Sequence, residues 1–149
     1  MGNIKILISC HKQSIVPDSE IMVPIEVGAD LRSRHIEGSI QDNTGDNISA
    51  KNKMYCELTA QYWAWKNLDA DYYGFFHYRR YLNFSDSKYP LDPWQNIVEE
   101  RFNDNCLKKY NLNDDCIRTL IETYDLVLSE EKNVAKMPDR NASVYEQYK

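Results

Sequence analysis

Short apolar runs open the chain and predict two strands. Residues 4–9 form a β-branched run, and residues 21–27 form a second run that contains Pro24. Because proline cannot donate a hydrogen bond to a neighbouring strand, we expect the second run at a sheet edge or as an irregular strand. Residues 28–48 are polar and rich in glycine, aspartate and asparagine. That composition is typical of a loop.

A helix is predicted over residues 49–68, with Ser49 as its N-cap. Large apolar side chains recur on one face at helical spacing, at Tyr55, Leu58, Tyr62 and Trp65, and Cys56, Ala60 and Trp63 widen that face. An apolar face of this width is normally buried, so we expect the helix to cover a sheet. The alternative is that some of these aromatic rings stack on a sugar.

Strands and helices continue to alternate in the second half of the chain. Residues 71–82 predict a central strand, residues 94–110 and 114–124 predict helices, and residues 125–129 predict a further strand. Ser143 suits the N-cap of another helix where the sequence ends, which suggests an incomplete domain. The predicted fold class is α/β, a single domain over residues 1–149 with a mainly parallel open sheet and flanking helices.

The formal net charge of the 149 residues is −5. That sign opposes nucleic-acid binding through the general field of the protein, so no nucleic-acid partner is expected and any anion site must be local. No apolar run approaches the ~18–20 residues of a membrane helix, and residues 1–12 do not resemble a signal peptide. We therefore expect a cytoplasmic protein without a transmembrane segment. The four cysteines form no C-x-x-C pair and are expected to be reduced.

Three cationic side chains, His77, Arg79 and Arg80, come at the end of the predicted strand 71–82. Alternation would place His77 and Arg79 on one face of the sheet and Arg80 on the other. In open α/β sheets ligands bind at the carboxyl ends of the strands, and the planar fork of arginine suits a phosphate or carboxylate. The alternative is that the arginines pair with acidic neighbours, for which Asp42, Asp46 and Asp86 are the candidates.

His11 and Lys12 follow the first predicted strand in the same way. They join the other cations if the two strands are neighbours, and otherwise they belong to an ordinary solvated turn. Residues 69–71, Asp-Ala-Asp, precede their strand, so we interpret them as a helix-to-strand turn and not as a metal site. Dinucleotide-binding, Walker, zinc-protease and serine-hydrolase motifs are absent from the sequence, and no metal or other cofactor is predicted.

Four motifs occur in fixed order: G-D-N-I-S, Y-C-E-L-T-A, Y-W-x-W-K-N and G-x-x-H-Y-R-R-Y, after an initial K-I-L-I-S-C-H-K. With them the chain resembles a bacterial family of capsule and exopolysaccharide biosynthesis, regarded as glycosyltransferases, from Lys5 to Tyr148. The family domain is longer, so this chain is similar to its amino-terminal part. The resemblance implies a GT-A-like nucleotide-sugar fold, in which His-Tyr-Arg stands where most GT-A enzymes have a metal-binding Asp-x-Asp.

The resemblance also implies roles for individual residues. His11 and Lys12 would lie near the nucleotide, Asp46 and Asn47 near the base, ribose or sugar, and His77, Arg79 and Arg80 around a diphosphate held without metal. Asn52 and Glu57 are secondary candidates for donor binding. For Asp46 and Asn47 the alternative is a loop that bonds its own backbone and caps the next helix. The sequence identifies no catalytic base.

The resemblance implies a hexosyltransferase, or a fragment of one, that uses a nucleotide-diphosphate sugar, taken here as a UDP-sugar. Its acceptor would be a growing capsular polysaccharide, exopolysaccharide or lipopolysaccharide glycan, free or lipid-linked, and the protein would then visit the inner face of the membrane. The alternative is a non-catalytic nucleotide- or carbohydrate-binding module. A third hypothesis is an RNA-binding surface, built from Tyr72, Phe75, Phe76 and Arg79.

Overall fold

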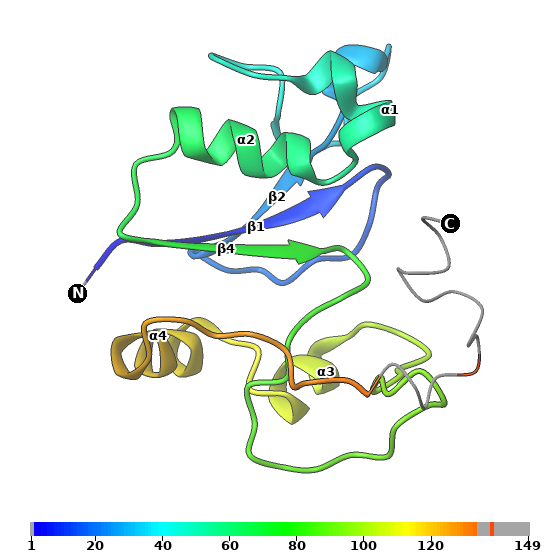
Figure 1. The fold of residues 1–149 in the computed structure, drawn as a ribbon, viewed down its shortest axis with the longest axis vertical. Coiled ribbons are helices and arrows are strands. Elements are labelled where there is room, and N and C mark those ends of the chain that lie inside the picture. Colours follow the sequence, from blue (N-terminus) through cyan, green and yellow to red (C-terminus); the bar gives the residue numbers. More distant parts are fainter. Residues whose placement is uncertain (1, 134–137, 139–149) are drawn as a thin grey trace.

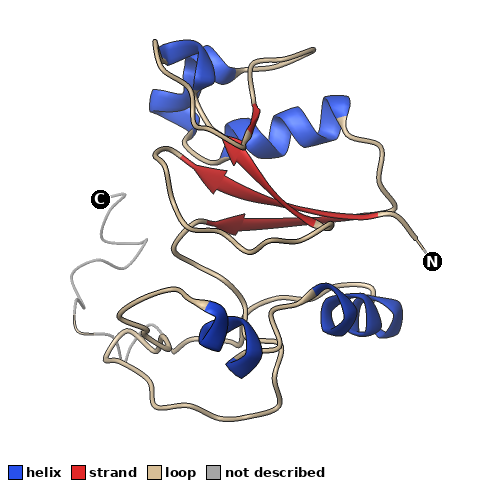
Figure 2. Ribbon diagram, turned by 180° about the vertical axis from the view of Figure 1, so that it is seen from behind, coloured by secondary structure: helices blue, strands red, loops and turns tan. Residues whose placement is uncertain are grey.

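A parallel four-stranded sheet lies between two helical layers in the computed structural model (Figures 1 and 2), which describes residues 2–133 and 138. The strands are β1 (Ile4–Cys10), β2 (Met22–Glu26), β3 (Ile40–Gln41) and β4 (Tyr72–His77), in the order β3-β2-β1-β4. One layer holds η1 (Ala29–Leu31), η2 (Ser49–Lys51), α1 (Asn52–Tyr55) and α2 (Leu58–Asn67), and the other holds α3 (Asp104–Lys109) and α4 (Asp114–Thr123). The predicted α/β fold with a parallel sheet is confirmed. The helix predicted from Ser143 lies outside the described residues.

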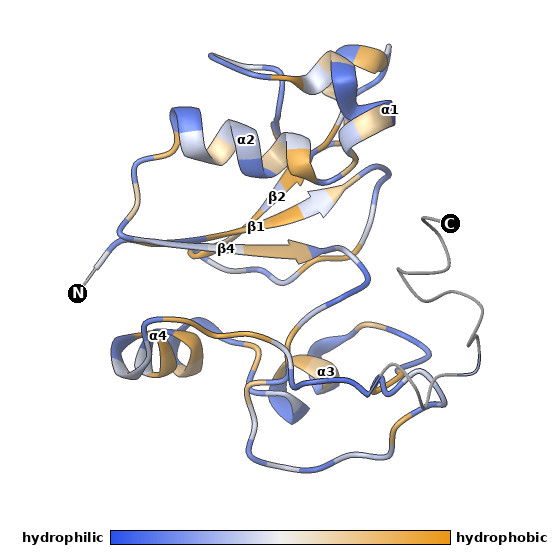
Figure 3. Ribbon diagram, viewed as in Figure 1, coloured by the Kyte–Doolittle hydropathy of each residue, from blue (hydrophilic) through white to orange (hydrophobic). Residues whose placement is uncertain are grey.

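Strand β1 is the centre of the sheet and is apolar on both faces. Ile4, Ile6 and Ile8 point toward α4 and join one core cluster, whereas Leu7 points toward α2 and joins the other. A strand buried on both faces contains a continuous apolar run, as β1 does at residues 6–8. Figure 3 shows hydrophobic residues along the strands.

The two neighbours of β1 differ from prediction. Strand β4 is an edge strand of the sheet formed by the described residues, so its assignment as a central strand is wrong. Strand β2 is flanked by β3 and is not an edge strand, but β3 pairs only with Ile25 and Glu26. Pro24 therefore lies where β2 has no outer partner, which is compatible with its missing N–H.

Close packing between β1 and β4 depends on one glycine. Gly74 pairs with Ile6, and a Cβ atom built on Gly74 would lie 2.7 Å from Ile6 Cγ1. Any larger residue would displace the Ile6 side chain from the core below the sheet. The register that follows from this contact places Ser9 opposite His77.

Helix α2 covers the sheet as predicted; Ala60 and Trp63 of the predicted face pack on it, whereas Leu58 and Trp65 are exposed. Its buried residues are Thr59, Ala60 and Ala64, and the two alanines pack against Leu7 and Ile25. Small side chains let the helix approach the sheet closely, so Leu58 and Trp65 point outward. The predicted single helix is also interrupted by Cys56, whose φ of 47° is unusual for a non-glycine residue.

Ser49 is not an N-cap. Its hydroxyl donates to Asp42 Oδ1 and accepts from the Asp30 amide at 3.1 Å, and Ile48 precedes η2. The serine therefore links the loop of residues 28–48 to the helical layer.

The second half contains less regular structure than its sequence pattern indicates. The helix predicted over residues 94–110 begins only at Asp104, because the Asp92 carboxylate accepts from the Trp94 and Asn96 amides and forms a turn there. Asn103 caps α3. The helix predicted over residues 114–124 is confirmed, with Asn113 as its N-cap. Residues 125–129 pair with no strand in the described part of the chain, so that prediction is wrong.

Candidate functional site

The carboxyl ends of β1 and β4 bring two groups of cations together. We call His11, Lys12, His77, Tyr78, Arg79 and Arg80 the strand-end cluster. The strands pair as far as Ser9 and His77, and the Tyr78 amide donates to the Ser9 carbonyl at 3.2 Å, just beyond the ladder. The condition for convergence of the two groups, that their strands be neighbours, is therefore met; His11 and Lys12 are both exposed, and anion binding by them stays a prediction.

A tight turn carries the two arginines. The Arg80 amide donates to the His77 carbonyl at 2.8 Å, and the His77 amide donates to the Arg80 carbonyl at 3.3 Å. Strand β4 thus ends at His77, and the expected alternation of Arg79 and Arg80 between the two sheet faces is wrong. Both arginine side chains are exposed at the sheet edge.

Tyr78 organises the cations around its ring. The His11 ring meets it edge-on with centroids 5.1 Å apart, Lys12 Nζ lies 5.6 Å from its centroid, and Arg79 Cζ lies 5.2 Å from it. Tyr78 itself is buried. Contacts between cations and an aromatic face are favourable but do not neutralise charge, so the cluster stays electropositive.

Neither arginine is paired with an acidic side chain within residues 2–133. No ion pair joins Arg79 or Arg80 to a carboxylate there, so the proposed pairing with Asp42, Asp46 or Asp86 is wrong.

His77 is the part-buried member of the strand-end cluster. Its Nδ1 accepts from the Arg79 amide at 3.2 Å, which leaves the proton of the neutral ring on Nε2. Burial lowers the pKa of His77 from its ordinary value of 6.5; nearby Arg80, Arg79 and His11 lower it too, while Glu57 opposes them. His77 is therefore neutral at pH 7 and gains a proton only in acid.

Glu57 reaches the cluster and Asn52 does not. Glu57 immediately precedes α2, and its Oε1 lies 3.6 Å from His77 Nε2 with its side chain 49% exposed. Asn52 instead donates to the Cys56 carbonyl at 2.7 Å and to Thr59 Oγ1 at 3.0 Å. These bonds hold the break between α1 and α2, so the visible role of Asn52 is structural.

Asp46 and Asn47 lie in a loop that is tied to α2. Tyr62 donates to Asp46 Oδ1 at 3.1 Å, which raises the Tyr62 pKa, and Asn67 bonds the Asp46 backbone on both sides. Asn47 Oδ1 accepts from the Ser49 amide at 3.1 Å. These are the contacts of a loop that bonds its own backbone, and none of those seen among the described residues reaches the strand-end cluster. A donor-binding role for this pair stays a prediction.

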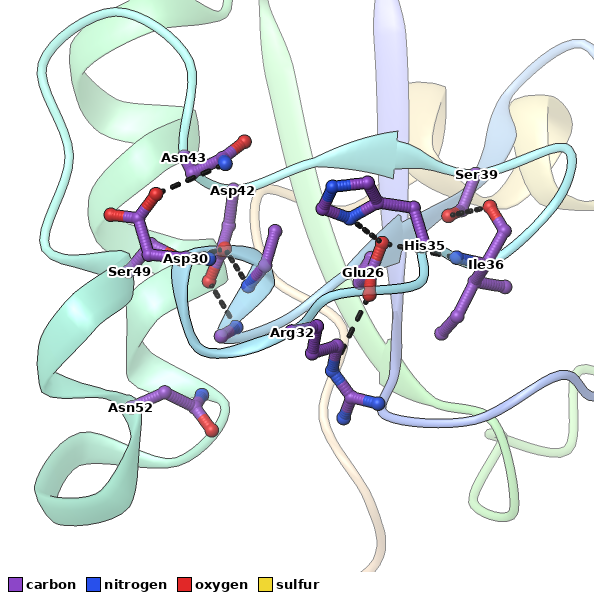
Figure 4. A network of polar contacts seen from close by, with 12 residues as sticks. Glu26, Asp30, Arg32, His35, Ile36, Ser39, Asp42, Asn43, Ser49 and Asn52 are labelled. Carbon is purple, nitrogen blue, oxygen red and sulfur yellow. Dashed lines mark hydrogen bonds and ion pairs between the residues drawn. The ribbon is translucent and has the colours of Figure 1, made fainter.

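A second charged group, missed by the sequence reasoning, lies at the end of β2 (Figure 4). We call Glu26, Arg32, His35, Asp42 and Ser49 the β2-end network. Glu26 is fully buried and contacts Arg32 Nε at 3.3 Å and His35 Nδ1 at 3.1 Å. Asp42, also fully buried, accepts from the Gly28 and Ala29 amides at 2.8 and 3.0 Å and from Ser49. The sequence feature that could have identified this network is Glu26, a charged residue inside the apolar run of residues 21–27.

A shallow pocket adjoins the strand-end cluster on the side of α3. Its volume is about 340 Å³, and it is lined by Ser14, Ile15, Tyr78, Arg101 and Phe102. Arg101 adds a cation that the sequence reasoning assigned to a helix. Phe76, in contrast, is buried in the core and cannot stack on a base, which removes one element of the RNA-binding hypothesis.

The Asp-Ala-Asp turn lies at the opposite end of β4, as predicted. The Asn3 amide donates to Asp71 Oδ2 at 2.7 Å, and Asn3 Nδ2 donates to the Asp69 carbonyl at 2.8 Å. These bonds fasten the entry of β4 to β1. Within the described residues, no group of three histidine, cysteine or acidic side chains has the geometry of a metal site, and none of the helices described there is long and apolar enough to cross a membrane.

Comparisons with known proteins agree with this architecture. Of the solved structures, a bifunctional glycosyltransferase, WbbM, in its apo form matches with a TM-score of 0.77 and 43% sequence identity. The match covers 80% of this chain and 21% of that one, so this chain spans about a fifth of the neighbour's length. No curated protein sequence shows significant similarity. The family described as "Domain of unknown function (DUF4422)" matches residues 5–149, and the chain belongs to that family.

Proposed function

We propose that this chain is the amino-terminal part of a glycosyltransferase domain and binds the diphosphate of a nucleotide sugar at the strand-end cluster. The 43% identity to a bifunctional glycosyltransferase supports the reaction class. The resemblance of the sequence motifs to capsule and exopolysaccharide enzymes supports a UDP-sugar as donor and a surface glycan, free or lipid-linked, as acceptor.

One observation carries the proposal: four cationic or titratable side chains from two parallel strand ends meet around Tyr78, and neither arginine of the cluster has a carboxylate partner among residues 2–133. A diphosphate needs such a site, because its charge must be balanced in the ground state and still more when it leaves with the bonding electrons. Two guanidinium groups can supply bidentate hydrogen bonds to the phosphate oxygens.

The same groups supply a reason to expect metal independence. A divalent cation on a leaving diphosphate stabilises the negative charge that develops there, and fixed arginines stabilise the same charge by hydrogen bonding. The one N–H of neutral His77, at Nε2, faces Glu57 Oε1 at 3.6 Å, so Glu57 positions the ring and this N–H is not a free donor to the phosphates. Glu57 is therefore a positioning residue in this proposal.

The adjoining pocket extends the site toward a sugar. Tyr78 belongs to both the pocket and the strand-end cluster. An aromatic wall formed by Tyr78 and Phe102, with Arg101 as a hydrogen-bond donor and the Ser14 hydroxyl, which donates to the Lys12 carbonyl, as an acceptor, suits the apolar face and hydroxyl groups of a pyranose ring. We assign this pocket to a sugar of the donor or of the acceptor.

A non-catalytic binding module is the second candidate function. It is favoured by the extent of the match, which covers only 21% of the enzyme that resembles this chain. Both candidates require donor binding, and only the enzyme releases UDP when an acceptor glycan is added. Turnover with a capsular or lipid-linked acceptor therefore separates them.

Calorimetric titration with UDP-sugars tests the proposal directly. We expect binding in the presence of EDTA and a loss of affinity of about a hundredfold or more in R79A/R80A, since each charge-assisted hydrogen bond contributes about 1.5–3 kcal/mol. The control is R118A, because Arg118 lies on α4 and forms an ion pair with Glu20 at 3.9 Å, away from the strand-end cluster. Binding that requires Mn²⁺, or unchanged affinity in R79A/R80A, would contradict the proposal.

A further inference from the structure

A half-exposed carboxylate, that of Glu57, contacts the cationic strand-end cluster. Glu57 Oε1 lies 3.6 Å from His77 Nε2, and the Glu57 side chain is 49% exposed whereas that of His77 is 12% exposed. Among the described residues, Glu57 forms no ion pair with Arg79 or Arg80. The cluster therefore contains a negative charge that leaves both guanidinium groups free.

The backbone just before Glu57 is held in an unusual conformation. Cys56 has φ 47° and ψ −128°, which non-glycine residues rarely adopt. The Cys56 amide donates to the Asn52 carbonyl at 2.8 Å, and the Cys56 carbonyl accepts from Asn52 Nδ2 at 2.7 Å and from Thr59 Oγ1 at 3.1 Å. A strained conformation persists only where its surroundings fix it, and such conformations cluster at functional sites. The break between α1 and α2 thus holds Glu57 firmly at the amino end of α2.

Helix α2 does not use the Glu57 carboxylate as a cap. Glu57 precedes the helix, but its side chain makes no capping hydrogen bond. A negative charge at this position interacts favourably with the helix dipole, which is the ordinary structural explanation for an acidic residue there. That explanation does not require the contact with His77, so the direction of the carboxylate has a further reason.

The carboxylate and the two guanidinium groups act on the same ring. Burial lowers the pKa of His77 most, Glu57 raises it, and Arg80 and Arg79 lower it further. An anion that binds the arginines would therefore also lie within range of the negative charge of Glu57. Charges separated by a few ångströms near a protein surface still interact measurably.

A nucleotide sugar and its product differ in the two properties that a carboxylate senses. The diphosphate of a UDP-sugar carries about two negative charges, whereas the terminal phosphate of free UDP has a second pKa of about 6 and adds roughly one more at pH 7. Free UDP also lacks the hydroxyl groups of the sugar. A site made of arginines alone would bind the more highly charged ion more tightly, so it would retain the product in preference to the donor.

We propose that Glu57 makes the strand-end cluster select a sugar-bearing diphosphate over free UDP. Its negative charge opposes the additional charge of the terminal phosphate, and the carboxylate can accept hydrogen bonds from hydroxyl groups of the sugar. Both effects favour the donor and help the product to leave. This inference rests on the proposed function, because it assumes that the diphosphate binds at Arg79 and Arg80.

Calorimetry with UDP-glucose, UDP-galactose and UDP tests the selection at a pH of about 7.5, where the terminal phosphate is deprotonated. We expect E57Q to bind UDP about tenfold more tightly than the parent does, the size expected for one charge pair near a surface. The UDP-sugar that binds the parent best should bind E57Q about threefold more weakly, since a neutral amide is a weaker acceptor than a carboxylate. The gain for UDP should shrink as salt is raised.

E20Q is the matched control. Glu20 is 91% exposed and pairs with Arg118 on α4, so E20Q should bind both ligands as the parent does. Thermal denaturation of E57Q measures the contribution of the helix dipole separately, because that contribution changes stability and not the ratio of the two affinities.

The outcomes separate this inference from the proposed function. An unchanged ratio of UDP-sugar to UDP affinity in E57Q would contradict the selection and leave the arginine site intact, since R79A/R80A measures that site independently. Equal weakening of both ligands in E57Q would show that Glu57 only holds His77 in place, and would also contradict it. A parent that binds neither ligand, or binds both without dependence on the arginines, would overturn the proposed function and this inference with it.

Discussion

Two charged groups lie at the same edge of the sheet, and they differ in how their charges are satisfied. In the β2-end network, the carboxylates of Glu26 and Asp42 are fully buried and face an arginine, a histidine, backbone amides and a serine. In the strand-end cluster, Arg79 and Arg80 are exposed and have no carboxylate partner within the described part of the chain. A buried charge without partners is strongly unfavourable, whereas an exposed one is solvated by water that a ligand can replace.

The comparison separates structure from function. The β2-end network holds the loop of residues 28–48 over the sheet, and both of its carboxylates are fully buried. The two arginines of the strand-end cluster are exposed and contribute little to holding the fold, so their hydrogen-bond donors are available to a ligand. Removing a residue from the first group should therefore change stability, and removing one from the second should change binding.

The largest effect is expected for D42A. Asp42 accepts from two buried amides and one hydroxyl, so alanine leaves the Gly28 and Ala29 amides without acceptors. We expect a loss of about 3 kcal/mol in the free energy of unfolding, the range for breaking a buried charge-assisted network. Thermal and urea denaturation measure it. D42N, which keeps one acceptor oxygen, should lose less than D42A.

Donor binding should survive D42A wherever the protein remains folded, because Asp42 has no contact with the strand-end cluster among residues 2–133. Equal losses of stability in D42N and D42A would show that charge, and not hydrogen bonding, is the property that matters. An unchanged melting temperature in D42A would contradict the structural role of the β2-end network.

R79A should have the opposite effect to D42A: little change in stability and a clear loss of donor binding. Arg79 is exposed and its guanidinium contacts the Tyr78 ring, so its loss should change the free energy of unfolding by no more than about 0.5 kcal/mol. Affinity for a UDP-sugar should fall by about tenfold, the value of one charge-assisted hydrogen bond. R79K, which keeps the charge but not the planar fork, should be intermediate in calorimetry. A large loss of stability in R79A would show that Arg79 has a structural role, like the residues of the β2-end network.

R32A provides the matched arginine in the other group. Arg32 Nε lies 3.3 Å from Glu26 Oε1, and the remaining Glu26 oxygen keeps His35 and the Ile36 amide. We therefore expect a moderate loss of stability, about 1.5 kcal/mol in denaturant melts, with unchanged UDP-sugar affinity. The comparison fails if R32A weakens binding as much as R79A does.

Sequence patterns identify the parts of this fold that depend on backbone and burial. The short β-branched run of residues 4–9 predicts β1, and the first-turn aspartates with an amphipathic pattern predict α4. The convergence of His11 and His77 also follows from the rule that parallel strands end at one edge. These predictions require only local composition and one topological rule.

Other features depend on contacts that a pattern does not contain. The buried face of α2 is set by Ala60 and Ala64, whose small size permits close approach to the sheet, although larger apolar residues lie on the opposite side. The late start of α3 depends on a turn at Asp92, and the burial of Glu26 depends on a loop residue, Arg32. Counting apolar residues favours Leu58 and Trp65, which are 51% and 71% exposed, over the small residues that form the core face of α2.

The smallest expected effect is a pH dependence of donor binding that His77 introduces. In the free protein, burial first and then Arg80, Arg79 and His11 hold the His77 pKa below its ordinary 6.5, so the ring is neutral at pH 7. A bound diphosphate favours the protonated ring and raises that pKa. Binding then takes up a proton, and affinity increases as pH falls from about 7 toward 5.5. We expect a gain of about threefold in calorimetry with a nucleotide sugar, whose diphosphate does not titrate in this range.

H77Q should bind with an affinity that does not change over the same pH interval, because glutamine keeps an N–H donor but cannot take up a proton.

E57Q separates the effect of the Glu57 carboxylate on the His77 pKa from the effect of the surrounding cations. The Glu57 carboxylate raises the His77 pKa, so its neutralisation should move the pH response to more acid values without abolishing it. The pH dependence of stability provides an independent check. A histidine whose pKa is lowered in the folded state destabilises the fold below pH 6.5. H77Q should therefore lose less stability there than the parent does. A parent profile that is flat, or one in which affinity rises with pH, would exclude His77 from the diphosphate site and leave the two arginines as its principal charges.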